Sequence, residues 1–141
     1  MGMFDNFTPT EISCNRPTYH YDDDTAELVI GATNTHLFNA PFLLSEYCKS
    51  FDIIYRQGLT VVITKHYDFS ENMGEDIEVN ECDDKDFSIV KVIISSEESK
   101  LFKNSVLECQ AQMKLYMQDD TILYSDSYDI NVKSPLDNKG V

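Results

Sequence analysis

Basic residues are scarce in this sequence. Eleven Lys and Arg stand against 25 Asp and Glu, which gives a formal net charge of −14 at pH 7. Because a surface this acidic repels phosphate groups, binding of nucleic acid or of an anionic membrane is disfavoured. The acidity predicts a well-solvated surface, with docking onto a basic protein partner as the alternative.

Histidine is scarcer still, with one residue in each of three distant segments: His20, His36 and His66. A metal site needs ligands that converge, and none of these residues has a second histidine within four positions. We therefore predict structural or surface roles for all three histidines.

The four cysteines are widely spaced, at Cys14, Cys48, Cys82 and Cys109. No two of them have the close spacing of a zinc knuckle or a redox dithiol. Cys109 falls on the apolar side of an alternating segment, where a free thiol behaves as a small hydrophobe. We expect reduced thiols in a protein made inside the cell.

Signatures of catalysis are missing as well. The sequence contains no P-loop, no Gly-rich phosphate cradle and no Gly-x-Ser-x-Gly elbow. Cys48 or Cys82 could pair with His36 or His66, but this is a chance combination of residue types. No pair of carboxylates is selected for sugar hydrolysis. We predict that the protein is not an enzyme and has no catalytic, cofactor-binding or metal-binding residues.

Asp and Glu side chains, whose carboxylate oxygens can bind calcium, are abundant in the segments 22–24, 71–86 and 119–120. None of these segments has the regular Asp-x-Asp-x-Asp-Gly series of an EF-hand loop. We interpret them as solvated loops, with a weak calcium site as the alternative.

Long hydrophobic runs are absent too. The first seven residues, Met-Gly-Met-Phe-Asp-Asn-Phe, have neither the basic start nor the apolar stretch of a signal peptide. No segment approaches the length of a membrane span.

The strongest positive signal is an alternation of apolar and polar residues from Val106 to Met117. Leu107, Cys109, Ala111, Met113, Leu115 and Met117 share one side. A period of two predicts a long β-strand with one buried face. Tyr128, Ile130 and Val132 alternate in the same way, and the polar residues 118–121 join the two segments as part of an antiparallel meander.

Further short strands are predicted along the chain, at 19–21, 26–30, 35–38, 51–55, 59–66, 77–79 and 87–94. Gln57-Gly58 forms a hairpin turn. Ser95 stands three residues before Glu98, which is the spacing of a helix-starting capping box. We predict an all-β fold: an antiparallel two-sheet sandwich of immunoglobulin-like character, with one short capped helical turn near 96–102.

The predicted domain organisation has three parts. Residues 1–30 form an N-terminal arm with a possible edge strand, and residues 31–134 form the β-sandwich. Residues 135–141 form a mobile tail.

Several pieces of the sequence, in order, carry a family resemblance: Gly31-Ala32-Thr33-Asn34-Thr35-His36 with Pro41-Phe42; Ile54-Tyr55-Arg56-Gln57-Gly58 with Val62-Ile63-Thr64-Lys65; Ile93-Ile94-Ser95-Ser96-Glu97-Glu98 with Leu101-Phe102; Glu108-Cys109-Gln110-Ala111-Gln112; and Tyr124-Ser125-Asp126 with Ile130, Val132-Lys133 and Leu136-Asp137. Over roughly residues 31–137 the chain resembles a family of small, uncharacterised proteins encoded by phages and prophages of Firmicutes. Family members usually have Pro in place of Asn34, Asp-Gly in place of Asp119-Asp120, and a shorter N-terminal arm.

The resemblance implies a non-enzymatic phage structural or assembly protein, associated with the tail or the virion. It implies other phage structural proteins as partners, and no catalytic residues. It also implies the host bacterial cytoplasm as the location during assembly, and the virion afterwards. The alternative is a stand-alone ligand-binding module for carbohydrate or calcium. Two routes to a partner are open: attraction to a basic surface, and addition of a strand at a sheet edge, including that of a second copy.

Overall fold

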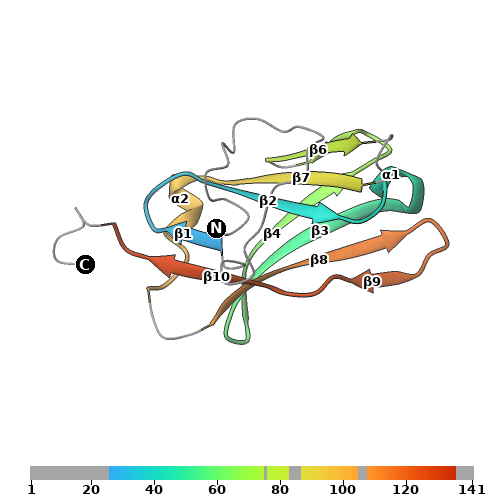
Figure 1. The fold of residues 1–141 in the computed structure, drawn as a ribbon. Coiled ribbons are helices and arrows are strands. Elements are labelled where there is room, and N and C mark those ends of the chain that lie inside the picture. Colours follow the sequence, from blue (N-terminus) through green and yellow to red (C-terminus); the bar gives the residue numbers. More distant parts are fainter. Residues whose placement is uncertain (1–25, 75, 83–86, 105–107, 136–141) are drawn as a thin grey trace.

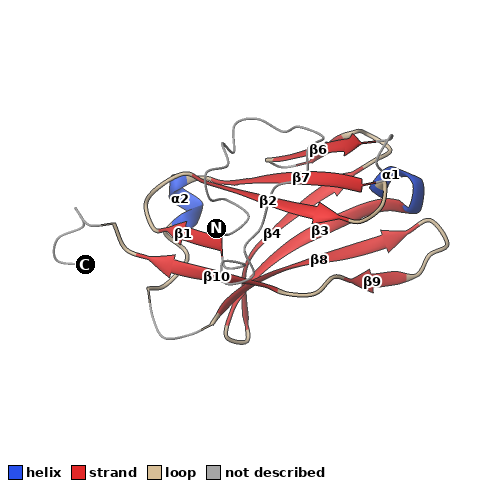
Figure 2. Ribbon diagram, in the orientation of Figure 1, coloured by secondary structure: helices blue, strands red, loops and turns tan. Residues whose placement is uncertain are grey.

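Two β-sheets build the domain in the computed structural model, which describes residues 26–74, 76–82, 87–104 and 108–135. The larger sheet has seven strands, in the order β1 (Ala26–Val29), β10 (Tyr128–Lys133), β8 (Cys109–Met117), β3 (Cys48–Gln57), β4 (Thr60–Asp68) and β5 (Met73–Gly74), with β9 (Ile122–Tyr124) beside β8. The smaller sheet has the order β2 (Asn34–Ala40), β7 (Phe87–Ile94) and β6 (Ile77–Cys82). Two single-turn helices, α1 (Leu44–Tyr47) and α2 (Ser96–Ser99), lie between strands (Figure 1). The predicted all-β, two-sheet sandwich is confirmed (Figure 2).

The core lies between the two sheets and follows the predicted alternation. Cys109, Ala111, Met113 and Leu115 on β8 are all buried, whereas the residues between them are half-buried on the opposite face. Strand β3 repeats the pattern with Phe51, Ile53 and Tyr55 in the core. The smaller sheet closes the core from the other side, chiefly with β-branched residues of β7. A period of two was therefore enough to identify the buried faces of β3 and β8.

Strand β1 is the exception to antiparallel pairing. Its residues run parallel to β10, with Ala26 opposite Ile130 and Val29 opposite Lys133. The two strands are far apart in the sequence, so no hairpin dictates their relative direction. Ala26 and Leu28 are buried in the core, which makes β1 a part of the sandwich although the sequence places it in the N-terminal arm.

The predicted meander is present, with one strand more than expected. The turn at residues 118–121 leads from β8 into β9, and β10 then pairs with the same side of β8 further along. Between the two pairings the register slips by one residue. Ser125 lies at the slip, where its Oγ accepts a hydrogen bond from the Met113 amide at 3.0 Å.

Helix α2 begins with the predicted capping box. The Ser95 Oγ accepts from the Glu98 amide at 3.0 Å, and the Glu98 carboxylate accepts from the Ser95 amide at 3.0 Å. Helix α1 was not predicted, because its N-cap residue Leu43 provides no side-chain cap. The anchor of α1 is tertiary instead: the Leu44 side chain is buried, and the Leu44 amide donates to the Ser88 Oγ at 3.0 Å.

Replacing Ser95 with Ala is expected to lower the free energy of unfolding by about 1 kcal/mol, because the Glu98 amide loses its acceptor. Chemical denaturation measures the change. Ser96→Ala, one position further on, removes no cap and serves as the matched control. Equal losses from both substitutions would contradict the role assigned to the box.

Candidate functional site

The outer face of the large sheet carries a connected group of polar and aromatic side chains. The strand register brings Asp52 of β3 directly between Lys114 of β8 and His66 of β4. One Asp52 oxygen lies 2.6 Å from the His66 Nδ1, and the other accepts a hydrogen bond from the Tyr116 hydroxyl at 2.9 Å. Asp52 therefore ties three neighbouring strands together on the face away from the core.

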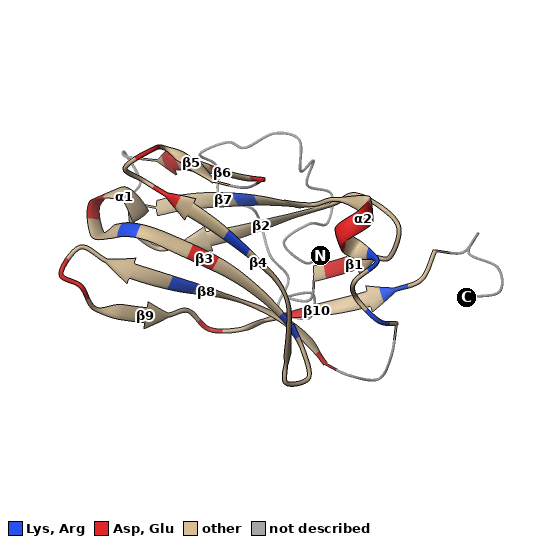
Figure 3. Cartoon of the chain, turned by 180° about the vertical axis from the view of Figure 1, so that it is seen from behind, with Lys and Arg blue, Asp and Glu red and all other residues tan. Residues whose placement is uncertain are grey.

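Lys114 extends this group to the edge of the sheet. Its Nζ lies 5.2 Å from the centre of the Tyr116 ring and 5.8 Å from that of the Tyr124 ring on β9. Contact with the Tyr116 hydroxyl, and then the nearby Tyr124, raises the pKa of Lys114, so the amine stays charged at neutral pH. Figure 3 shows this side of the molecule, with basic positions on β3 and β8, an acidic position on β3, and acidic positions in the turn between β8 and β9.

Strand β9 forms an exposed apolar edge beside that group. Its three residues are all large and apolar, and Ile122, Leu123 and Tyr124 are 50%, 50% and 57% exposed. The other large apolar residues that are exposed in the described part of the chain do not form such a run within one strand. Among the described residues, β9 is hydrogen-bonded to β8 alone. A run of this kind on an unpaired edge strand is a site where another chain can attach.

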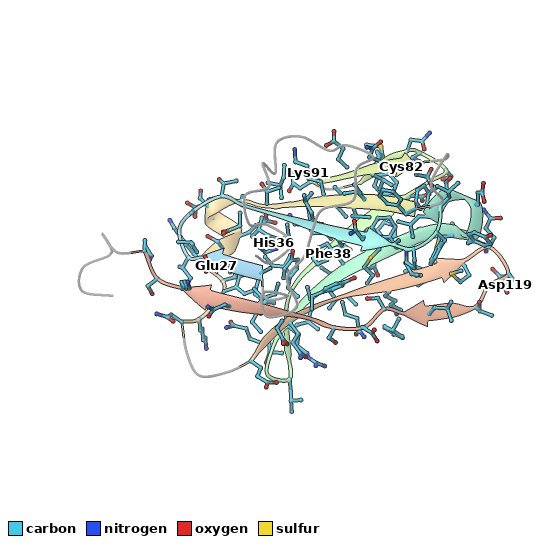
Figure 4. The ribbon with its side chains drawn as sticks, in the orientation of Figure 1. Glu27, His36, Phe38, Cys82, Lys91 and Asp119 are labelled. Carbon is cyan, nitrogen blue, oxygen red and sulfur yellow. The ribbon has the colours of Figure 1, made fainter. Side chains whose placement is uncertain are left out.

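Carboxylates flank β9 at both ends. Asp119 and Asp120 occupy the turn before it, where Figure 4 labels Asp119, and Asp126 follows it. Hydrogen bonds from the Thr121 hydroxyl and amide hold the pKa of Asp119 below its usual value. Asp120 forms an ion pair with Lys49, whereas the described residues place no cation within ion-pair distance of Asp126.

The two described histidines are in different places, as expected from their spacing. His36 is buried between the sheets, with Nδ1 2.6 Å from the Tyr55 hydroxyl and Nε2 2.8 Å from the Glu27 carbonyl oxygen (Figure 4). Burial lowers the pKa of His36 to about 4, against the opposing effect of the Glu27 hydrogen bond. His66 is on the outer face, and His20 lies outside the described residues.

The cysteines differ in part from the prediction. Cys48 and Cys109 are free and buried, and burial raises their pKa values to about 11 and 12, which leaves both thiols protonated. Cys82 is disulfide-bonded, so the expectation of a reduced thiol is wrong at this position. Cys14 lies outside the described residues. The correction has a physical basis, because sequence spacing does not report which thiols meet in space.

Two carboxylates of the predicted acidic loops form ion pairs: Asp76 with Lys65 and Asp120 with Lys49. Lys65, whose ammonium is buried, donates to Asp76 at 2.9 Å and also to Glu98 of α2 at 2.6 Å. Burial opposes the charge on Lys65, but these hydrogen bonds raise its pKa overall. Within residues 26–74, 76–82, 87–104 and 108–135, no group of three or more His, Cys, Asp and Glu side chains could hold a metal ion. The segments 22–24 and 83–86 are outside those ranges.

Sequence reasoning missed both the Lys65 cluster and the edge at β9. Lys65 occupies a core-facing position of β4, where a charged residue is normally unexpected. The signal for β9 was the run Ile-Leu-Tyr after a polar turn, which is too short to predict a strand with confidence from periodicity.

Both helices in the described part of the chain are single turns, and neither has the length or apolarity to cross a membrane. Comparison of the sequence with protein-family models and with curated proteins finds no match.

Proposed function

We propose that this protein is a non-enzymatic structural or assembly component of a phage particle, associated with the tail or virion, and that it acts through protein–protein contacts. The observation that carries the proposal is the edge strand β9, with three consecutive apolar side chains at least half exposed. The phage context is supported by the sequence resemblance over roughly residues 31–137.

The environments of the reactive side chains favour docking over catalysis. Burial keeps the thiols of Cys48 and Cys109 protonated at neutral pH, so they are poor nucleophiles. The buried His36 is engaged by Tyr55 and Glu27. Asp52 contacts both His66 and Tyr116 on the outer face of the sheet rather than in a pocket that excludes water.

Induction of a lysogen that carries the gene tests the proposal. We expect the chain to be present at a fixed copy number in purified particles or in assembly intermediates, as measured by quantitative mass spectrometry. Absence from both particles and intermediates would overturn the proposal.

The association rate with the physiological partner is expected to fall at least severalfold between about 50 and 500 mM salt. The net charge of −14 creates a field that attracts a basic surface. Salt at the upper end of this range shortens the Debye length to a few ångströms. Stopped-flow mixing or surface plasmon resonance measures the rate. A rate that does not change with salt would remove the electrostatic contribution and leave the acidity as a solubility feature.

Carbohydrate binding is the second candidate function. Tyr116 and Tyr124 lie on adjacent strands, each within 6 Å of the Lys114 ammonium, and exposed aromatic rings of this kind can stack against a sugar. The ammonium of Lys114 lies over both rings, however, and a sugar would have to displace it. We therefore rank docking first. A glycan array followed by titration of any hit with Tyr124→Ala distinguishes the two functions.

A further inference from the structure

We propose that residues 1–25 of this chain dock on the outer face of the smaller sheet, and that a disulfide between Cys14 and Cys82 holds them there. The occupant of this face is thus a segment of the same chain, which adds a third layer to the sandwich. The inference goes beyond the proposed function and does not depend on it. It explains an apolar surface that is separate from the main core.

The outer face of the smaller sheet carries a second apolar cluster, which consists of Leu37, Cys82, Phe87 and Ile89. The strand register places Cys82 directly opposite Phe87, so the two share one side of the sheet. Phe38 and Val90, the next residues along their strands, are on the other side and belong to the main core. The two sides can be followed in Figure 4, where Phe38 and Cys82 are labelled.

The four side chains of this cluster are each 1% exposed or less. All four belong to the smaller sheet itself, and the larger sheet packs on its other face, so the strands and helices of the described ranges provide no layer over them. Ile54 shows what an open position retains: on the outer face of the central strand β3 it is only half-buried. Even Lys91, which is opposite Leu37, has a side chain only 15% exposed. Burial of this extent requires a further layer.

The disulfide at Cys82 identifies the segment that provides this layer. The chain has four cysteines, of which Cys48 and Cys109 are free. Cys82 is disulfide-bonded, so a bond within the chain leaves Cys14 as its partner. Because Cys82 is part of the apolar cluster, a bond to Cys14 brings the middle of the segment 1–25 onto this face.

The segment also has the composition that the face requires. Residues 1–25 contain several large apolar and aromatic side chains, among them Phe4, Phe7, Ile12, Tyr19 and Tyr21. Of the other segments outside the described ranges, 83–86 is entirely charged, and neither 105–107 nor 136–141 contains a cysteine. Residues 1–25 are therefore the part of the chain that can supply both the apolar contacts and the sulfur.

The connection is long enough. The Glu27 carbonyl oxygen is 2.8 Å from the His36 Nε2, so β1 begins beside β2. From His36, the position of Cys82 is two strands across the smaller sheet and several residues along it, a separation of about 20 Å. The residues between Cys14 and Ala26 span up to about 40 Å when extended. Since β2 is at the edge of its sheet, the segment can pass around β2 to reach the outer face.

Formation of the bond is a two-electron oxidation. The thiols of Cys14 and Cys82 each lose one hydrogen atom as the sulfur–sulfur bond forms, and a small-molecule disulfide accepts both hydrogen atoms as it is cleaved to two thiols. A dithiol reductant reverses the reaction. Because cytosolic thiols are kept reduced, the bond persists only where such an oxidant is available. The redox state of the surroundings therefore decides whether residues 1–25 are held covalently.

Disulfide mapping tests the covalent part of the inference. The chain is equilibrated with oxidised glutathione, its free thiols are alkylated under denaturing, non-reducing conditions, and its peptides are identified by mass spectrometry. We expect alkylation of Cys48 and Cys109, one linked pair of peptides that contains Cys14 and Cys82, and a monomer in sedimentation velocity. A bond from Cys82 to another cysteine or to a second chain, or no bond at Cys82, would overturn the inference.

Solvent access to isoleucine methyl groups tests the docking itself. Ile53 is in the core and Ile54 is on the outer face of the larger sheet, so the two serve as references for the NMR line broadening caused by a soluble gadolinium chelate. In the oxidised protein we expect the Ile89 methyl signals to be broadened as little as those of Ile53, and to give NOEs to protons of residues 1–25. Broadening equal to that of Ile54, or an absence of NOEs to residues 1–25, would contradict the docking.

Three variants separate the bond from the rest of the fold. Cys14→Ser removes the bond, so it should lower the urea denaturation midpoint and abolish the effect of dithiothreitol on it. Cys82→Ser should do the same and lower the midpoint further, because it also places a hydroxyl in the apolar cluster. Cys48→Ser, at another buried cysteine, is the matched control and should keep the full response to dithiothreitol. An unmodified oxidised chain whose midpoint does not respond to dithiothreitol would overturn the inference. Circular dichroism confirms that each variant is folded.

Discussion

Replacing Met113 with Asp is expected to lower the free energy of unfolding by more than about 3 kcal/mol, because it places an unpaired carboxylate in the core. Met113 is 3% exposed, on the face of β8 that packs toward the smaller sheet. The residue directly opposite Met113 on β3 is the apolar Ile53. The core cluster that contains Met113 consists of hydrophobic residues within the described part of the chain, so the new charge is either buried or neutralised at a cost.

The same substitution one residue earlier is the matched control. Gln112 faces the opposite side of β8, where its amide nitrogen donates to the Ser125 carbonyl at 2.7 Å. Gln112→Asp loses this hydrogen bond and is expected to cost about 1 kcal/mol or less. Urea denaturation of both variants measures the difference. Equal destabilisation would mean that the two faces of β8 have been assigned wrongly.

Acidification from about pH 6.5 to pH 4 is expected to remove about 3 kcal/mol of stability through His36 alone. Burial lowers the pKa of His36 from 6.5 to about 4, so the folded protein holds the neutral imidazole. In this window the unfolded chain binds a proton that the folded chain does not. Stability therefore rises with pH between the two values, and its loss on acidification is complete below about pH 4.

His36→Gln tests this pH dependence. The variant is expected to be less stable at pH 7, because the bonds to Tyr55 and Glu27 are disturbed, but to have a flatter stability profile between pH 6.5 and 4.5. Denaturation midpoints at several pH values measure the profile. His66→Gln is the control, since its ring is on the outer surface. A profile unchanged by H36Q would contradict the assignment.

The contribution of Glu98 to the pH dependence of stability falls at lower pH than that of His36, so the two contributions can be measured separately. Burial raises the pKa of Glu98, but hydrogen bonds from Lys65 and Ser95 outweigh it and hold the value below the usual 4.5. A depressed carboxyl pKa contributes stability at higher pH, which is lost as the pH falls through the folded value. The window above pH 4.5 thus reports mainly on His36.

Some features of the candidate site could be predicted from the sequence, and others could not. The two routes to a partner, charge and strand addition, followed from composition and fold class. The sequence did not identify β9 as the edge strand, because β9 has only three residues. The prediction instead took the turn at 118–121 to connect β8 directly to β10. The Asp52–His66–Tyr116 contacts bring together three strands whose register is set by pairing across the sheet.

The sequence by itself determined the secondary structure that depends on neighbouring residues. Alternation identified the buried faces of β3 and β8, and the Ser95–Glu98 spacing identified the start of α2, because pleat geometry and helix capping act over a few residues. Only the tertiary structure decided the features that depend on distant residues: the parallel pairing of β1 with β10, the buried Lys65 between Asp76 and Glu98, and the open edge at β9. Each requires segments far apart in the chain to meet, and their energies arise from burial and charge at that meeting rather than from local propensity.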